Sequence, residues 1–298
     1  MTSEVGKVIR SHWDVYADKY RTDIQQHVLQ SRSFYYLLER LKKVKGTLSG
    51  GLWLDAGCGP GCFSSSILNE NYTALIGVDM STEMVRIAEK KSIYRAVYHG
   101  SLCNLDMIED AQVSVYFSNN VFHFVNVLAE NALNEALAEA FRVLKDKGIL
   151  ALNMSGEYTS HDFIQECKKI VKKECEKRGE YDENTNPQGV KVNLVREYPI
   201  GSISIASFEQ KVEEQGFKIQ DAVMHSEHID YPNKSAYIAA MSTYAKYLYL
   251  LPFHHLSDQE KDDIYQEMVD QFLVNEQGPY RNIHYMNYIV ASKCKSEI

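Results

Sequence analysis

The sequence lacks an excess of positive charge, since 32 Lys and Arg against 40 Asp and Glu give a formal net charge of −8. Proteins that bind nucleic acid depend on cationic surface, so this balance argues against a nucleic-acid partner. The sequence also lacks a run of about 18 apolar residues, the length of a membrane-spanning helix. Even the most apolar late segment, 236–251, is interrupted by Ser242, Thr243 and Lys246. We therefore expect no membrane partner either.

Cysteines at metal-binding spacing are lacking as well. None of the six cysteines has CxxC spacing, and none lies at zinc-finger distance from a histidine. Free thiols in a reducing compartment and no bound metal are therefore expected. Segment 1–20 mixes charged and aromatic side chains and has no apolar signal-peptide core. Together these absences predict a cytoplasmic protein.

Tyrosine is abundant instead, with 20 residues against 11 Phe and 2 Trp. Its large apolar face and single hydroxyl suit half-polar cavities as well as cores. Apart from Tyr72, Tyr94, Tyr98 and Tyr116, every tyrosine lies near the N-terminus or from residue 158 onward. This distribution predicts a substrate pocket built from those two regions.

Short apolar runs alternate with helical patterns from residue 52 onward, after a helical segment in which Phe34, Leu37, Leu38 and Leu41 share one face. Strands are expected at 51–57, 74–78, 96–99, 113–118, 149–154, 217–225 and 283–293, and helices at 62–69, 82–91, 129–144, 159–178, 207–215 and across 232–273. The helix at 207–215 is expected to begin with a serine cap and to end at Gly216. The alternation predicts an α/β fold in which the carboxyl ends of parallel strands share one edge, where ligands bind.

A glycine-rich turn, Leu54-Asp55-Ala56-Gly57-Cys58-Gly59-Pro60-Gly61-Cys62, follows the first expected strand. Glycine at three of these positions lets the backbone turn sharply and lets a ligand lie against it. A dinucleotide site of the GxGxxG type needs its third glycine one place later, where Cys62 stands. This disfavours a pyrophosphate ligand.

Asp79 ends the next expected strand, about twenty residues further on, where an acid accepts hydrogen bonds from the two hydroxyls of a ribose. Together with the glycine turn, this acid predicts a nucleoside-containing cofactor. Taken alone, Asp79 could also be an acid at a helix N-terminus, with Ser81 as the cap.

The motif LDAGCGPG, followed by GVDMSTEMVRIAEK, resembles class I S-adenosylmethionine-dependent methyltransferases. Residues 98–102, 116–119 and 140–148 are similar to later motifs of that family, in the same order. The resemblance implies a methyltransferase with S-adenosyl-L-methionine as cofactor and S-adenosyl-L-homocysteine as product. It also implies a Rossmann-like doubly wound sheet, mostly parallel with an antiparallel last strand, with N-terminal helices and a helical lid.

The resemblance divides the chain into six segments. They are 1–48 (N-terminal helices), 49–156 (cofactor-binding core), 157–205 (lid insertion), 206–231 (core helix and strand), 232–282 (helical lid insertion) and 283–298 (last core strand and tail).

Carried over residue by residue, the resemblance places the methionine part of the cofactor on the glycine turn, the ribose on Asp79 and the adenine on Met80. The residues expected to bind the cofactor are Tyr20, Asp55, Gly57, Gly59, Gly61, Asp79, Met80, Ser101, Leu102, Ser118 and Asn119. Ser101 departs from the family, which has an aspartate there that accepts from the adenine amino group. Tyr20 would close over the cofactor, or Tyr16 and Tyr20 simply pack one helix face.

Transfer of an activated methyl group is an in-line displacement that depends on proximity and alignment. A base is needed only for a protonated acceptor such as an amine or phenol. Candidate catalytic residues are His123 and Tyr20, and packing is the alternative role for His123. Candidate substrate residues are Tyr16, His123, Tyr244, Arg196 and Arg281. Either arginine could pair with a second carboxylate of the substrate.

Within the family, the chain is most similar to the malonyl-acyl-carrier-protein methyltransferases of biotin synthesis. This similarity implies a small-molecule acceptor with a carboxylate oxygen, either a free acid or one bound to an acidic acyl-carrier protein. The basic run between Lys168 and Arg178 could dock such a carrier, or it is a solvated helix face. Three other functions stay open: an N-methyltransferase of a small amine, a nucleoside-binding module without catalysis, and a dehydrogenase, which Cys62 disfavours.

Overall fold

The computed structural model describes residues 4–23, 28–48, 50–64, 74–156, 169–170, 173–174, 176–178, 202–237, 256–275 and 281–294. Its helices are α1 (Glu4–Asp23), α2 (Val28–Lys45), α4 (Thr82–Ala88), α5 (Phe122–Val125), α6 (Ala132–Val143), α9 (Ile205–Glu214) and α11 (Asp258–Asn275). Its strands are β1 (Leu52–Ala56), β2 (Ala74–Asp79), β3 (Ala96–His99), β4 (Val113–Ser118), β5 (Leu144–Ser155), β6 (Phe217–Asp230) and β7 (Arg281–Lys293).

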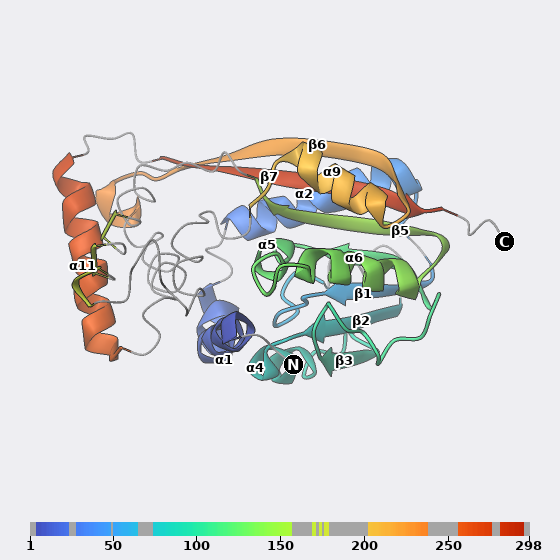
Figure 1. Ribbon diagram of the computed structural model, residues 1–298, viewed down its shortest axis with the longest axis horizontal. Helices are drawn as coiled ribbons and strands as arrows, with labels where there is room; N and C mark the ends of the chain where they lie inside the picture. The colour runs from blue at the N-terminus through green and yellow to red at the C-terminus, as the bar shows by residue number, and fades with distance from the viewer. Residues whose placement is uncertain are drawn as a thin grey trace.

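The strands form one seven-stranded sheet in the order β3-β2-β1-β4-β5-β7-β6 (Figure 1). Strands β1 to β5 pair in parallel, and β7 is antiparallel to both of its neighbours, β5 and β6. This confirms the expected α/β class: a Rossmann-like sheet, mostly parallel, with an antiparallel last strand. The order changes direction at β1, so the loops after β1 and β4 leave the same edge on either side of a crevice.

Helices cover both faces of the sheet because alternate strand residues point to opposite faces. On one face, Phe34, Leu37 and Leu41 of α2 pack with Val115 and Phe117 of β4. On the other face, the apolar sides of α6 and α9 pack with a second set of strand residues that includes Tyr116. The helical face predicted for segment 34–41 is therefore the buried one.

Several boundaries differ from the expectation. Helix α9 begins at Ile205 rather than at residue 207, because the cap is Ser204, whose side-chain oxygen accepts from the Ser207 backbone N–H at 3.1 Å. Gly216 ends this helix as expected, with φ of 88°. The strand expected at 149–154 is β5, which already begins where α6 ends.

Strands β6 and β7 are longer than expected and pair with each other from Phe217–Lys293 to Asp230–Arg281. Each strand therefore supplies the hydrogen-bonding partners for the backbone of the other. Both strands extend beyond the rest of the sheet toward α11 (Figure 1). The helix expected at 62–69 is absent over its described residues, 62–64, which form a bend. Of the helix expected at 159–178, only residues 169–170, 173–174 and 176–178 are described. Of the helical stretch expected across 232–273, residues 238–255 lie outside the described residues, 234–237 are helical, and α11 covers the end.

No helix among the described residues is long and apolar enough to cross a membrane.

Candidate functional site

The glycine turn leaves β1 at the crevice and is held close to β2. The backbone N–H groups of Gly57 and Cys58 both donate to the carbonyl oxygen of Val78, at 2.8 and 3.0 Å. Gly57 has φ of 74°, and a Cβ on it would lie 2.4 Å from a methyl carbon of Val121. Glycine is therefore required at this position both by the backbone conformation and by the close approach of the loop after β4.

The acid at the end of β2 faces the same turn. The Asp79 carboxylate accepts from the backbone N–H of Gly59 at 2.8 Å and from that of Ser81 at 2.9 Å. Burial raises the pKa of Asp79 to about 6, and these two N–H groups partly oppose the shift. Ser81 caps α4 by accepting from the Met84 N–H. Asp79 is therefore beside the helix N-terminus but does not cap it.

Asp55, at the end of β1, is buried and already has partners within the chain. The Tyr94 hydroxyl donates to its carboxylate at 2.7 Å, and the Ser64 hydroxyl donates to the same oxygen. Burial raises the pKa of Asp55, and both hydrogen bonds oppose that shift. A Cβ on Gly61 would lie 2.7 Å from the Tyr94 ring. These contacts of Asp55 and Tyr94 stabilise the shape of the glycine turn.

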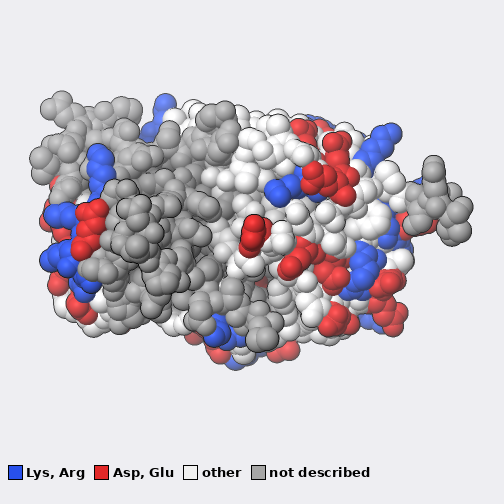
Figure 2. Space-filling view, viewed as in Figure 1, with Lys and Arg blue, Asp and Glu red and all other residues white. Residues whose placement is uncertain are grey.

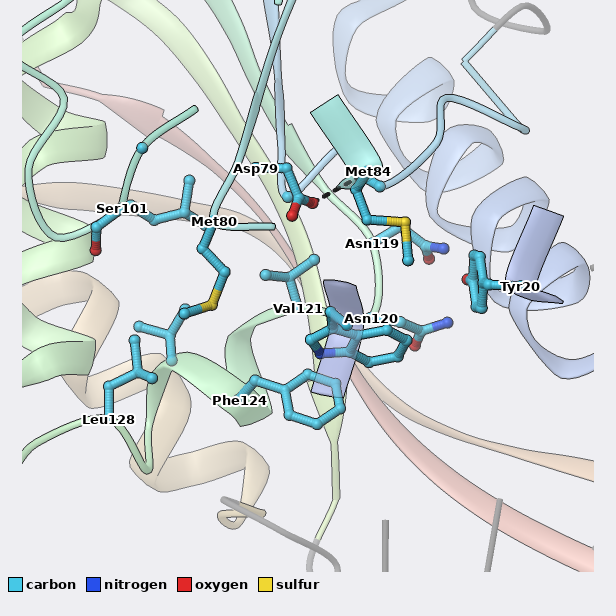
Figure 3. A pocket seen from close by; sticks show the side chains of 16 residues that line it. Tyr20, Asp79, Met80, Met84, Ser101, Asn119, Asn120, Val121, Phe124 and Leu128 are labelled. Carbon is cyan, nitrogen blue, oxygen red and sulfur yellow. Dashed lines mark hydrogen bonds between the residues drawn. The ribbon is translucent and has the colours of Figure 1, made fainter. Parts of the chain in front are cut away.

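A pocket opens above this turn at the carboxyl edge of the sheet (Figure 3). It combines backbone of the turn with apolar and aromatic side chains and four polar ones, Asp79, Ser101, Asn119 and Asn120. Its lining residues are Trp13, Tyr20, Gly57, Gly59, Asp79, Met80, Met84, Gly100, Ser101, Leu102, Asn119, Asn120, Val121, Phe124, Val125 and Leu128. Figure 3 shows Tyr20 and Ser101 on opposite sides, with Asp79 between them.

Most of the residues expected to bind the cofactor meet here. Tyr20, Gly57, Gly59, Asp79, Met80, Ser101, Leu102 and Asn119 line this pocket. Asp55 lines an adjoining cavity, together with Tyr20 and Asn119. Gly61 and Ser118 line neither; the buried Ser118 hydroxyl donates to the Ala56 carbonyl at 2.7 Å and joins β4 to β1.

Helix α1 contributes an aromatic stripe to the pocket. The Trp13 ring lies edge-on to Tyr20, with centroids 5.7 Å apart, and edge-on to Phe124 at 5.4 Å. Tyr16 is buried, packs on Tyr20 at 5.8 Å and does not line the pocket. Tyr20 therefore both packs the helix face and borders the pocket, so the two alternatives are compatible.

Sequence reasoning missed an amide network behind the pocket wall. Asn119 accepts from the Asn153 side chain at 2.7 Å, and Asn153 accepts from the Asn120 backbone N–H at 2.7 Å. The Asn120 side chain donates to the Ser33 hydroxyl of α2 at 2.8 Å. Asn120 has φ of 60°, which asparagine tolerates better than most residues. The paired asparagines after β4 were the available signal.

The remaining candidates are not brought to the pocket. His123 lies in α5 beside Phe124, and burial lowers its pKa to about 4. Its Nδ1 atom is buried and makes no hydrogen bond within the described part of the chain. The Arg281 guanidinium pairs with Asp230 across β6 and β7, at 2.5 Å. Arg196 and Tyr244 lie outside the described residues.

Three described members of the basic run, Lys173, Lys177 and Arg178, pair with acids. Lys173 lies 2.9 Å from Glu267 of α11, and Arg178 lies 3.6 Å from Glu260 of the same helix. Figure 2 shows basic and acidic side chains next to each other at this end of the molecule. Their charge is balanced within the chain.

Residues 54–152 match the family described as "Methyltransferase domain". Malonyl-[acyl-carrier protein] O-methyltransferase of Hamiltonella defensa is 27% identical over 131 residues, which cover 44% of this chain and 48% of that protein. An uncharacterised methyltransferase of Schizosaccharomyces pombe is 29% identical over 120 residues, 40% of this chain and 45% of that protein. The chain spans about half the length of the curated relatives it matches.

Solved structures share the fold at low identity. YcgJ from Bacillus subtilis has a TM-score of 0.54 at 16% identity, covering 88% of this chain and 100% of that one. A chain in the complex of the Haloferax volcanii Trm112 methyltransferase activator with a methyltransferase has a TM-score of 0.55 at 15% identity, covering 97% and 99%. Residues 54–152 are therefore similar to a methyltransferase domain, and the solved structures share the fold of this chain.

Proposed function

We propose that this pocket binds S-adenosyl-L-methionine and that the protein transfers its methyl group to the carboxylate oxygen of a small molecule. The observation that carries the proposal is the order of groups along the pocket. The glycine turn lines an adjoining cavity together with Tyr20. In Figure 3 the Asp79 carboxylate lies between Tyr20 and the end where Met80 and Ser101 lie, and apolar Leu102 also lines the pocket. This order matches the methionine, ribose and adenine parts of the cofactor.

Each part of the pocket fits the group assigned to it. Gly57 and Gly59 present backbone without side chains, so the methionine part can lie against the turn. The Asp79 carboxylate has lone pairs beyond the two that the backbone N–H groups occupy, and these can accept from ribose hydroxyls. Met80 and Leu102 offer apolar surface for the faces of a purine.

The bound cofactor supplies a methyl group on a sulfonium, activated for displacement by an acceptor lone pair. The chain's own part is then to align the acceptor and exclude water. Trp13, Tyr20 and Phe124 form an apolar wall at the reacting end, and the Asn119 and Asn120 amides are held by the network behind them. No covalent intermediate with the protein is required.

A carboxylate acceptor suits this wall because it needs no base. Among the described lining residues, the ionisable side chains are Asp79 and Tyr20, and burial raises the pKa of Tyr20 so that its hydroxyl stays protonated. The partial match to malonyl-[acyl-carrier protein] O-methyltransferase supports the same acceptor class. Because Lys173, Lys177 and Arg178 of the basic run are already paired with acids, we favour a free acid over one bound to a carrier protein.

A small amine is the second candidate acceptor, and one observation favours it. Aromatic faces of Trp13, Tyr20 and Phe124 gather at the wall, while no Lys or Arg lies among the described lining residues. Such a wall can hold a cation by the ring faces. A nucleoside-binding module without catalysis is the remaining alternative.

Calorimetry with S-adenosyl-L-homocysteine, set against NAD, tests the cofactor. We expect heat with the former only, and Asp79→Ala should weaken binding by more than about tenfold. Incubation with methyl-labelled cofactor and matched panels of small acids and amines tests the acceptor. Methyl esters support the proposal, products on amines alone replace it with the second candidate, and binding without product on either panel favours the module.

A further inference from the structure

A second cavity continues from the cofactor pocket beyond Ser101. We call it the outer groove. Its lining includes Arg10 of α1, Asn104, Ala129 just before α6, and Glu135 within α6. Met80, Gly100, Ser101 and Leu128 line both the cofactor pocket and the outer groove. The two cavities therefore share a wall made of these four residues.

Two of these four residues, Gly100 and Ser101, are small. Gly100 has no side chain, and a Cβ there would lie 2.5 Å from the end of Met107. Ser101 is small, and its side-chain oxygen accepts from the Cys103 N–H at 3.2 Å. Met80 is an unbranched, adaptable side chain that can move aside. A ligand that ends at Ser101 thus faces open space rather than a closed end.

The orientation of a purine at this end follows from polarity. Met80, Leu102 and Leu128 are apolar and suit the ring faces, whereas Ser101 is the polar side chain among the described residues at that end (Figure 3). The hydroxyl keeps its proton and one lone pair, so it can meet the polar edge of the six-membered ring. The substituent at position 6 then points toward the outer groove.

We propose that the outer groove is a subsite for a substituent on the six-membered ring, so that the protein accepts N6-substituted adenosyl ligands. This inference rests on the proposed function, which places the purine between Met80 and Leu102. The groove suits an arylmethyl group, because Leu128 and Ala129 offer apolar contact and the Arg10 guanidinium can stack on a ring face. Asn104 and Glu135 form its polar rim.

Calorimetry with S-adenosyl-L-homocysteine and its N6-benzyl derivative tests the subsite. We expect the two dissociation constants to agree within about threefold, less than the tenfold that corresponds to 1.4 kcal/mol. Each ligand should displace the other, because they share the adenosyl site. A derivative that binds more than about thirtyfold more weakly than the parent, or that does not compete with it, overturns the inference.

A variant that fills the groove gives the second readout. Ala129 is exposed, so Ala129→Phe adds bulk to the groove without entering the core. It should weaken the N6-benzyl ligand by more than about tenfold and leave S-adenosyl-L-homocysteine within about twofold. Glu130→Phe, at the adjacent exposed position outside the groove lining, is the matched control and should change neither. An equal loss of both ligands in Ala129→Phe contradicts the subsite. Failure of the parent ligand to bind the unaltered protein overturns the proposed function, and this inference with it.

Discussion

The Ser81 hydroxyl donates to the Asp14 carboxylate at 2.6 Å, and the same carboxylate oxygen accepts from the Glu83 N–H at 3.2 Å. Asp14 lies in α1, and Glu83 lies in the first turn of α4. The Ser81 N–H donates to Asp79. One short chain of hydrogen bonds therefore connects the helix that carries Trp13 and Tyr20 with the acid at the end of β2.

Replacing Asp14 should loosen α1 over the pocket. Asp14→Ala removes an acceptor at the N-terminus of α4, which should lower the free energy of unfolding by about 1 kcal/mol. Because α1 forms one wall of the pocket, we also expect weaker binding of S-adenosyl-L-homocysteine, by about three- to tenfold. Denaturant unfolding and calorimetry measure the two effects. Asp18→Ala is the control: its side chain is 72% exposed and lies 4.0 Å from Arg86, so a similar loss there would contradict the role of Asp14.

Asp79 should make cofactor binding depend on pH. Its pKa of about 6 lies above the ordinary value of 3.8 because of burial. For folding, a raised acid pKa gives stability that is complete below the unfolded value and is lost as the pH rises through 6. For binding, the sign is opposite, because ribose hydroxyls donate to the ionised carboxylate. The dissociation constant for S-adenosyl-L-homocysteine at pH 5 should be up to about tenfold higher than at pH 7.5.

Asp79→Asn is the control for this pH dependence. Asparagine keeps one acceptor oxygen but does not titrate, so its affinity should be lower and nearly flat between pH 5 and 7.5. A step of the same size in the variant would assign the dependence to another group.

Gly57 and Gly59 should respond differently to alanine. Both have positive φ, which costs a non-glycine residue about 1–2 kcal/mol. A Cβ at Gly57 also meets Val121 at 2.4 Å, whereas at Gly59 nothing lies within 4 Å. Gly57→Ala should therefore destabilise the protein more than Gly59→Ala, as measured by denaturant unfolding. Adding Val121→Ala should recover the steric part only, and equal effects of the two single variants would refute this account.

Arg142 should contribute more to the free energy of unfolding than an exposed arginine does. Its guanidinium donates to both carboxylate oxygens of Glu139 and to the carbonyl oxygens of Ile108 and Leu105. The Glu139 carboxylate also accepts from the Leu105 N–H at 2.6 Å, so the pair holds the segment after Leu102. Arg142→Ala should lower the free energy of unfolding by about 2–4 kcal/mol. Arg86→Ala, which removes an exposed pair with Glu83, should lower the free energy of unfolding by much less, because solvent screens that pair.

The positions of most strands and the glycine turn could be anticipated because they rest on local chemistry. Alternation of apolar positions marks buried strands, and positive φ at Gly57, Gly59 and Gly61 requires the residue type found there. The acid at Asp79 follows its strand at the interval that a nucleoside site uses. These signals lie within short stretches of chain, so the sequence alone is enough to recognise them.

The boundaries of β6 and β7 were underestimated because each depends on the other. Their terminal residues pair Asp230 with Arg281, and nothing local marks either position as extended. The cap of α9 was misplaced by three residues because both Ser204 and Ser207 are capable of capping. Only the backbone geometry distinguishes them, since Ser204 is extended and accepts from Ser207.

The sequence by itself determined the fold class, the turn and the acid, because backbone conformation and periodicity are properties of neighbouring residues. Only the tertiary structure decided which side chains surround the pocket. Asp14 meets Ser81 across 67 residues, and Asn120 meets Ser33 across 87. The outer groove exists because α1, the segment after β3 and α6 converge beside Ser101. Contacts between distant segments form only when the whole sheet and its helices have packed, so no local sequence pattern predicts these contacts.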